Sequence, residues 1–275
     1  MAEGTDEVEW ARLKAHELRA LAERDACVIL PIASIEQHGP HLPVMTDTRL
    51  GHEVAVRAAR LASPKRPTVV TPVVWSGLSE HHMAFGGTLI LSHATFRAVI
   101  RDLVEALTRH GFRDVLISNS HGGNIVAMQG IADELATVLP ATIVATTYVS
   151  EASLAFARLL EDQSGVQHAC EAETSMMLAV EPDLVDASDL ASLATDRGPG
   201  FLAAGKASYR WRPFQHMTAN GVSGVPAKAS AEKGGRLLDA AAEAIAALIV
   251  DPETWAAPQD RRGEGIGGVP FRRDA

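Results

Sequence analysis

Short apolar runs rich in β-branched residues alternate along this chain with longer segments of helical periodicity. The runs lie at 27–34, 68–74, 114–118 and 141–147. The helical segments lie at about 7–23, 48–61, 94–110, 125–139, 170–180 and 229–249. This alternation predicts βαβ units with right-handed crossovers, and therefore an α/β fold with a mainly parallel central sheet and helices on both faces. Ligands bind to such sheets at the carboxyl ends of the strands.

Length and composition indicate one large soluble domain. The chain has 275 residues, of which 47% are apolar and 21% are charged, values typical of a globular enzyme. We expect a single domain over residues 1–257. The segment 258–275, rich in Gly, Arg and Asp, is expected to be a mobile C-terminal tail.

Charge and segment hydropathy exclude several kinds of partner. The formal net charge is -9, which disfavours nucleic acid because phosphate binding needs a Lys/Arg-rich face. The acidic N-terminus does not have the pattern of a signal peptide, and no apolar run approaches the ~20 residues of a membrane span. We therefore expect a cytoplasmic protein with no membrane partner. Cys27 and Cys170 are expected to be small packing residues in a reducing compartment.

The densest polar cluster, IEQHGPHLPVMTDT at 35–48, directly follows the first predicted strand. In extended backbone the side chains of Glu36 and His38 point the same way, so both can reach one metal ion. A polar surface loop is the alternative reading. Asp47 could cap the helix that follows, as could Thr46 or Thr48, but beside Glu36 and His38 it is also well placed to bridge two cations.

A second cluster, NSHGGN at 119–124, follows the third predicted strand. Gly122 and Gly123 beside His121 would let the backbone approach a metal or substrate closely, and Asn124 is expected to cap the next helix. An ordinary turn histidine is the alternative for His121.

The third cluster is QHACEAETSMML at 167–178. On a helix, Glu173 shares its face with apolar residues, so its carboxylate is predicted to point toward the core. A buried carboxylate needs a partner, and a metal ion would serve. A distant arginine, a protonated acid or a misplaced helix are the alternatives. His168 can reach the same cavity, whereas Glu171 is expected on the surface.

Other polar groups follow the strands in loops. We expect structural or supporting roles for His41, Glu80, His81 and His82.

Together, three carboxylates and two imidazoles suit two divalent ions such as Zn²⁺, Mn²⁺, Fe²⁺ or Co²⁺. The five candidate ligands are Glu36, His38, Asp47, His121 and Glu173. With Asp47 bridging, the two metals would share a water molecule whose lowered pKa makes hydroxide for attack on a carbonyl.

The order and spacing of four motifs resemble the creatininase family. These are EQHGPHLP followed by TDT, SEHHMAFGGTLIL, SHGGN, and an H-x4-ETS pattern at 168–175. The resemblance runs from about Cys27 to Pro182. It implies a three-layer α/β/α fold, a two-metal centre at the strand ends, hydrolysis of non-peptide or unusual C–N bonds, and a homo-oligomer that is frequently a hexamer.

The resemblance also implies residue roles. The metal ligands carry over to Glu36, His38, Asp47, His121 and Glu173. Catalysis carries over to Glu173 and to His168, which resembles the residue that moves a proton to the leaving nitrogen. Substrate-binding or supporting positions are His41, His82, Gly122, Gly123 and Asn124.

Three departures from creatininase itself leave the substrate open. Gly123 stands where creatininase has a ligand glutamate, Ser164 where it has tryptophan, and Gln167 where it has glutamate. Creatinine-like, formamide-like and modified-peptide substrates all occur in the family. The alternatives are a two-metal phosphoesterase, which the absence of Lys or Arg beside the three clusters disfavours, and a non-catalytic metal-binding protein.

The aromatic stretch SYRWRPFQHM at 208–217 stands out in an aromatic-poor chain. We expect it to be either a lid over the substrate or a subunit interface.

Overall fold

A computed structural model describes residues 7–193 and 209–268. The strands are β1 (Cys27–Ile32), β2 (Thr68–Val70), β3 (Asp114–Asn119) and β4 (Thr142–Thr147). The helices are α1 (Ala15–Glu23), α2 (Thr46–Ala62), α3 (His93–Arg109), α4 (Ile125–Val138), α5 (Tyr148–Glu151), α6 (Ser153–Leu159), α7 (Glu171–Val180) and α8 (Ala231–Val250).

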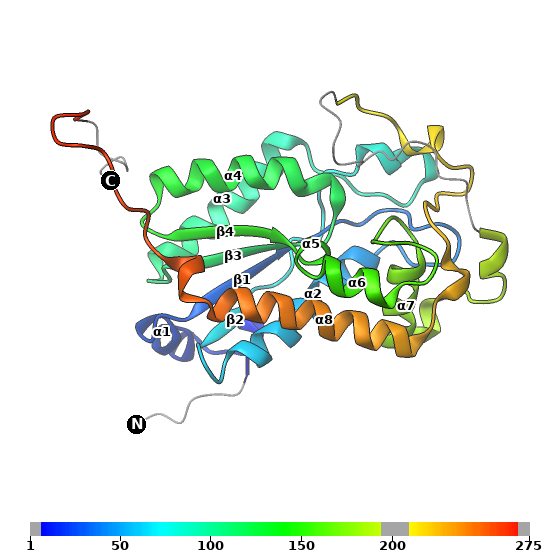
Figure 1. Cartoon of the computed structure of the whole chain (residues 1–275), viewed down its shortest axis with the longest axis horizontal. Helices are drawn as coiled ribbons and strands as arrows, with labels where there is room; N and C mark the ends of the chain where they lie inside the picture. Colours follow the sequence, from blue (N-terminus) through cyan, green and yellow to red (C-terminus); the bar gives the residue numbers. More distant parts are fainter. Residues whose placement is uncertain (1–6, 194–208, 269–275) are drawn as a thin grey trace.

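The four strands form one parallel sheet in the order β2-β1-β3-β4 (Figure 1). β1 lies inside the sheet and pairs with both β2 and β3, from Cys27 opposite Thr68 and Asp114. All six residues of β1 are buried, as expected for a parallel strand with helices on both sides. The predicted α/β fold with a parallel sheet is confirmed.

Alternate residues of β1 face two separate apolar cores. Ile29 packs with Val54 of α2 and Ile245 of α8 on one face, whereas Val28 packs with Phe96 of α3 and other residues on the opposite face. Figure 1 shows α3 and α4 over one side of the sheet and α2 and α8 over the other. This period-2 division follows from the pleat of a strand and makes three layers.

Several predicted boundaries were wrong. The first predicted helix, 7–23, is a short 3-10 turn at Trp10–Arg12 followed by α1, because Lys14 between them is extended. The second strand ends at Val70 instead of at residue 74. Pro72 follows shortly after, and proline has no backbone N–H to donate to a strand ladder. Helices α5 and α6 were not predicted.

The C-terminal segment adds little to the described core. Residues 256–268 are exposed, whereas the rest of the predicted tail lies outside the described residues, so its mobility stays a prediction. Within 7–193 and 209–268, no helix combines the length and apolarity that crossing a bilayer requires.

Candidate metal centre

A cavity of about 490 Å³ opens at the carboxyl ends of the strands, where polar side chains from the loops after β1 and β3 and from α2 and α7 converge. Its acidic and imidazole lining is Glu36, Asp47, His81, His82, His121, His168 and Glu173. The remaining lining residues are Ser120, Gly122, Gly123, Ile125, Thr147, Val149, Ser150, Val166, Gln167, Phe214, Met217 and Ser223.

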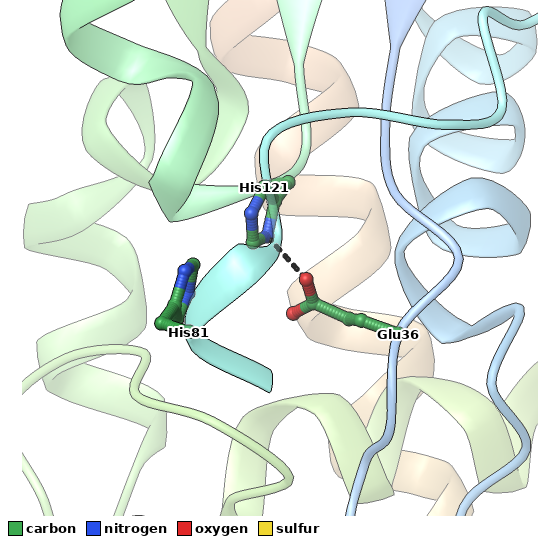
Figure 2. Close-up of side chains that lie close together, drawn as sticks. All are labelled: Glu36, His81 and His121. Atoms are coloured by element: carbon green, nitrogen blue, oxygen red, sulfur yellow. Dashed lines mark ion pairs between the residues drawn. The ribbon is translucent and has the colours of Figure 1, made fainter. Parts of the chain in front are cut away.

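Asp47 lies between the two imidazoles that the sequence singled out. Its Oδ1 is 3.3 Å from His38 Nε2, and its Oδ2 is 3.2 Å from His121 Nδ1. Glu36 Oε2 is 3.1 Å from the same His121 nitrogen. Figure 2 shows the Glu36 carboxylate and the His121 ring pointing toward one another. One carboxylate therefore touches two separate histidines, the arrangement needed to bridge two ions.

The rings of His38 and His121 each form a hydrogen bond through one nitrogen to a group outside the cluster. The other nitrogen of each ring faces the cluster. His38 Nδ1 donates to the carbonyl of Glu36 at 3.0 Å, so Nε2 is the ring nitrogen that faces the cluster. His121 Nε2 lies 3.1 Å from Ser79 Oγ and 3.3 Å from the Leu78 carbonyl, which can accept its proton. His121 Nδ1 therefore faces the carboxylates. In metal sites, a hydrogen bond from the ring nitrogen that does not bind the metal orients the imidazole.

Three of the converging atoms are buried without a hydrogen-bond partner: Glu36 Oε2, His38 Nε2 and Asp47 Oδ2. Buried polar atoms are almost always hydrogen-bonded. Each of these three atoms instead faces another member of the cluster at 3.1–3.3 Å without forming a hydrogen bond, an arrangement that a cation between them would satisfy. Carboxylate oxygen and imidazole nitrogen are the donors that Zn²⁺ and Mn²⁺ prefer. The residues present therefore fit divalent cations.

Glu173 joins the same cluster from α7. One carboxylate oxygen accepts a hydrogen bond of 2.5 Å from the Ala169 backbone. Ligand atoms of His38, Asp47 and Glu173 lie within 4.8 Å of one another, as do those of Glu36, His81 and His121, and of Glu36, His38 and His168. All five predicted ligands thus lie together, and Glu173 is buried as predicted.

The carboxylates and imidazoles shift one another's proton affinities strongly. Burial lowers the pKa of His38, but the charges of Asp47, Glu173 and Glu36 outweigh burial and raise it to about 10. Burial, reinforced by the charge of Asp47, raises the pKa of Glu173. Protons held in this way are the ones that a bound cation displaces.

Gly123 lies where the surrounding atoms leave no room for a side chain. A Cβ atom at 123 would lie 2.4 Å from both His121 Nε2 and the Leu78 carbonyl oxygen, and 3.0 Å from the His81 ring. No side chain fits there without a shift of the backbone. Position 123 therefore cannot supply a carboxylate, whereas Glu173 lies in the same cluster as His38 and Asp47.

His168 turns one ring nitrogen toward the cavity and Glu36. Its Nε2 donates to the Gln37 carbonyl at 2.7 Å, and its Nδ1 is 3.5 Å from Glu36 Oε1. Burial and then the charge of His38 hold the pKa of His168 well below its usual value. The side chain is therefore a neutral base whose open nitrogen faces the centre.

His81 was expected only as a supporting residue, yet its ring lines the cavity and stacks on His121 with centroids 5.6 Å apart. Figure 2 shows it beside the Glu36–His121 pair. Burial lowers its pKa to about 3, so the ring is neutral and able to bind a cation. The only sequence signal for this role was that His81 and its neighbour His82 lie in a loop that follows a predicted strand.

The supporting residues hold the loops around the cluster. His41 Nε2 and Thr174 Oγ1 of α7 are 2.9 Å apart. Asn124 was predicted to cap α4, but its side chain forms no capping hydrogen bond. Instead its amide accepts from the Leu78 backbone and donates to the Ala33 carbonyl, because two loops approach it closely. Capping by Thr46, Asp47 or Thr48 is not seen either, since Met45 precedes α2 without a side-chain cap.

Glu171 was predicted on the surface, and this was wrong. Its side chain is fully buried and forms an ion pair with Lys233 of α8. It also accepts hydrogen bonds from the backbone of Glu161 and Asp162, at 3.1–3.2 Å. Helical periodicity could not reveal this burial, because the partners come from α8 and the loop after α6.

The described part of the aromatic stretch divides in two. Phe214 is buried against the centre, with its ring 4.3 Å from His82 and 4.9 Å from His168. Tyr209 and Trp211 are 75% and 48% exposed. Phe214 therefore forms a wall of the cavity, while the two exposed rings face away from the packed core. Ser208 lies outside the described residues.

Comparison with known proteins points to one family. Residues 11–249 match the family model Creatininase, described as creatinine amidohydrolase. The mycofactocin precursor peptide peptidase of Mycobacterium ulcerans is 29% identical over 223 residues, which cover 76% of this chain and 79% of that protein. The creatinine amidohydrolase of Pseudomonas putida is 31% identical over 188 residues, which cover 63% and 71%. A solved structure described as "Creatininase Mn" superimposes with a TM-score of 0.72 at 26% identity, covering 91% of this chain and 99% of that one.

Proposed function

The chain belongs to the creatininase family, and from this premise we propose that it is a divalent-metal-dependent amidohydrolase. The bond cleaved is the C–N bond of a small cyclic or linear amide, of creatinine-like, formamide-like or modified-peptide type. Relatives described as a creatinine amidohydrolase and a peptidase support hydrolysis of a C–N bond. The observation that carries the metal dependence is the set of unsatisfied buried atoms on Glu36, His38 and Asp47.

We propose two cation positions that share Asp47. His38 Nε2, Asp47 Oδ1 and Glu173 would hold one ion, and Glu36 Oε2, Asp47 Oδ2 and His121 Nδ1 the other. Zn²⁺, Mn²⁺ and Fe²⁺ all suit these donors. When bound, such a pair of ions activates water at neutral pH and polarises the carbonyl of the amide.

His168 is the residue proposed to carry the proton. Its Nε2–H is committed to the Gln37 carbonyl, so the lone pair of Nδ1 faces the reacting groups. A neutral imidazole in this position can take a proton from the attacking water and return it to the leaving nitrogen. Phe214 packs against its ring and limits the access of bulk water.

The lining of the cavity favours an uncharged amide with an apolar group. Aliphatic and aromatic walls come from Ile125, Val149, Val166, Phe214 and Met217. A volume of about 490 Å³ lies in the range of pockets for drug-sized ligands, which leaves room for a substrate larger than the creatinine ring. No described lining residue is Lys or Arg, so a phosphate group would lack the cations that usually bind it.

The test begins with the metal. Purified protein is analysed for metal content, reconstituted separately with Zn²⁺, Mn²⁺ and Fe²⁺, and assayed against creatinine, formamides, short peptides with apolar ends and a phosphate monoester. We expect about two ions per chain and turnover of an amide. Turnover of the phosphate ester alone would instead support a phosphoesterase, and bound metal with no turnover a binding protein.

We also propose a homo-oligomer, as the family resemblance implies, and a cytoplasmic location, which the sequence pattern at the N-terminus favours. The exposed rings of Tyr209 and Trp211 would be covered in such an assembly. Sedimentation velocity measures the mass directly, and a monomer at all concentrations would contradict the assembly.

A further inference from the structure

The side-chain amide of Gln37, which lies between two proposed ligands, has one possible orientation. Its Oε1 accepts a hydrogen bond from the Gly39 N–H at 2.9 Å, and its Nε2 donates to the Gly221 carbonyl at 3.2 Å. A backbone N–H can only donate and a carbonyl can only accept, so these two groups fix which end is oxygen and which is nitrogen. Gly221 has φ +80°, and a Cβ there would lie 2.0 Å from Gln37 Oε1.

The second proton of the amide determines the tautomer of His82. Gln37 Nε2 is 2.7 Å from His82 Nδ1, and because the amide nitrogen can only donate, this ring nitrogen must accept. The proton of the neutral His82 ring then lies on Nε2, which is 3.4 Å from Glu36 Oε1. His82 therefore presents an N–H to one oxygen of Glu36 and leaves the other, unsatisfied oxygen for the centre.

The backbone of the same residue determines the tautomer of His168. Its carbonyl accepts from His168 Nε2 at 2.7 Å, so the lone pair of that ring lies on Nδ1. The Gln37 amide nitrogen is also 3.0 Å from His168 Nε2. Both amide protons are already donated to Gly221 and His82, and we therefore assign the His168 proton to the carbonyl.

We infer that Gln37 is a positioning residue that fixes the protons of His82 and His168. Through His82 the side-chain amide aims Glu36 at a cation. The backbone carbonyl of the same residue, which Gln37→Leu leaves in place, turns His168 Nδ1 toward the cavity. This inference rests on the proposed function for its consequence, but the tautomers themselves follow from the hydrogen bonds. Outer partners of this kind typically change metal affinity or activity by about 10- to 100-fold.

The test compares Gln37→Leu with Gln163→Leu. Gln163 is a matched control because it is equally buried, at 6% exposure, and its amide also bonds to backbone, donating to the Gly165 carbonyl at 2.7 Å. It is not among the residues that line the cavity. Long-range ¹H–¹⁵N NMR of zinc-loaded protein reports the tautomer of each ring, with His82 assigned from its loss in His82→Asn.

We expect wild type and Gln163→Leu to show His82 protonated on Nε2, and Gln37→Leu to show a mixture or the other tautomer. Zinc affinity, measured by competition with a chelating dye, should fall about 10- to 100-fold in Gln37→Leu alone. On any amide that is turned over, kcat should fall more than KM changes. The tautomer and the zinc affinity are measured without a substrate. A lack of activity on every amide would therefore count against the proposed function only.

A His82 proton on Nδ1 in the wild-type protein would overturn the inference, even if Gln37→Leu failed to fold. An unchanged tautomer in a folded Gln37→Leu, or an equal loss of zinc affinity in Gln163→Leu, would do the same.

Discussion

Glu171 and Glu173 are separated by one residue on α7 and have different partners. Glu171 is paired with Lys233, whereas Glu173 lies among His38 and Asp47. The neighbouring side chains, and not the helix itself, divide these two carboxylates into a structural and a proposed functional group.

Exchange of each glutamate for glutamine should separate these roles. Glu173→Gln is expected to weaken metal binding by more than the about 10- to 100-fold that an outer partner contributes. When both proteins are compared free of metal, it should lose little stability. Glu171→Gln should keep its metal but lose about 3 kcal/mol of stability, because it breaks a buried ion pair. Metal analysis and urea denaturation measure the two effects. Equal effects of the two changes on metal content would contradict the assignment.

The two cysteine thiols are expected to be chemically silent in the folded protein. Burial raises the pKa of Cys27 to about 12 and that of Cys170 to about 11. Because the thiolate is the reactive form, a thiol reagent at pH 8 should react only after unfolding, and then with both residues. Fast reaction of the native protein would contradict this.

The same shifts have a consequence for stability at alkaline pH. Above the ordinary thiol pKa the unfolded chain loses these protons while the folded chain keeps them, so stability should fall as pH rises. Cys27→Ala should reduce the slope of that decline in denaturation experiments.

At the scale of elements, α7 holds its position because α8 approaches it closely. A Cβ atom at Gly234 of α8 would lie 1.8 Å from the carbonyl oxygen of Ser175 in α7, whereas one at Gly235 would meet nothing within 4 Å. Close helix packing therefore requires glycine at position 234, whereas position 235 has room for a larger side chain.

Alanine at each position tests this packing. Gly234→Ala should push α8 away from α7, lower the melting temperature and disturb the position of Glu173. Gly235→Ala should be neutral or stabilise by up to about 1 kcal/mol, because alanine favours a helix. Calorimetry gives both values, and a harmless Gly234→Ala would show that the two helices can separate without cost.

At the scale of the whole molecule, the proposed ligands join four separate segments. Glu36 and His38 follow β1, Asp47 begins α2, His121 follows β3 and Glu173 lies on α7. Bound cations should therefore stabilise the complete fold and not one loop.

Removal of the cations tests this coupling. Free metal at 1,000 times its Kd stabilises a protein by about 4 kcal/mol, so a chelator should lower the melting temperature by roughly 10 °C. Asp47→Asn, which should bind the ions poorly, is the control and should respond little to chelator. An equal response in both proteins would place the stabilising metal elsewhere.

The sequence alone predicted the fold class and the edge of the sheet at which the candidate ligands meet. Strand and helix periodicity is a local property, so the parallel sheet could be predicted from runs such as 27–34 and 114–118. Because parallel strands end at one edge, the polar loops after them were expected to meet, and Glu36, His38, Asp47 and His121 lie together. The apolar face of α7 likewise predicted the burial of Glu173.

Only the tertiary structure decided what each buried polar group contacts. Glu171 is buried because Lys233, 62 residues away, reaches it, and Gln37 is held by Gly221, 184 residues away. His81 could be placed in the cavity only once its loop was folded against the segment that follows β3. The physical reason is that periodicity specifies which face of an element avoids water, whereas the partner of a buried polar atom comes from whichever distant segment packs against it.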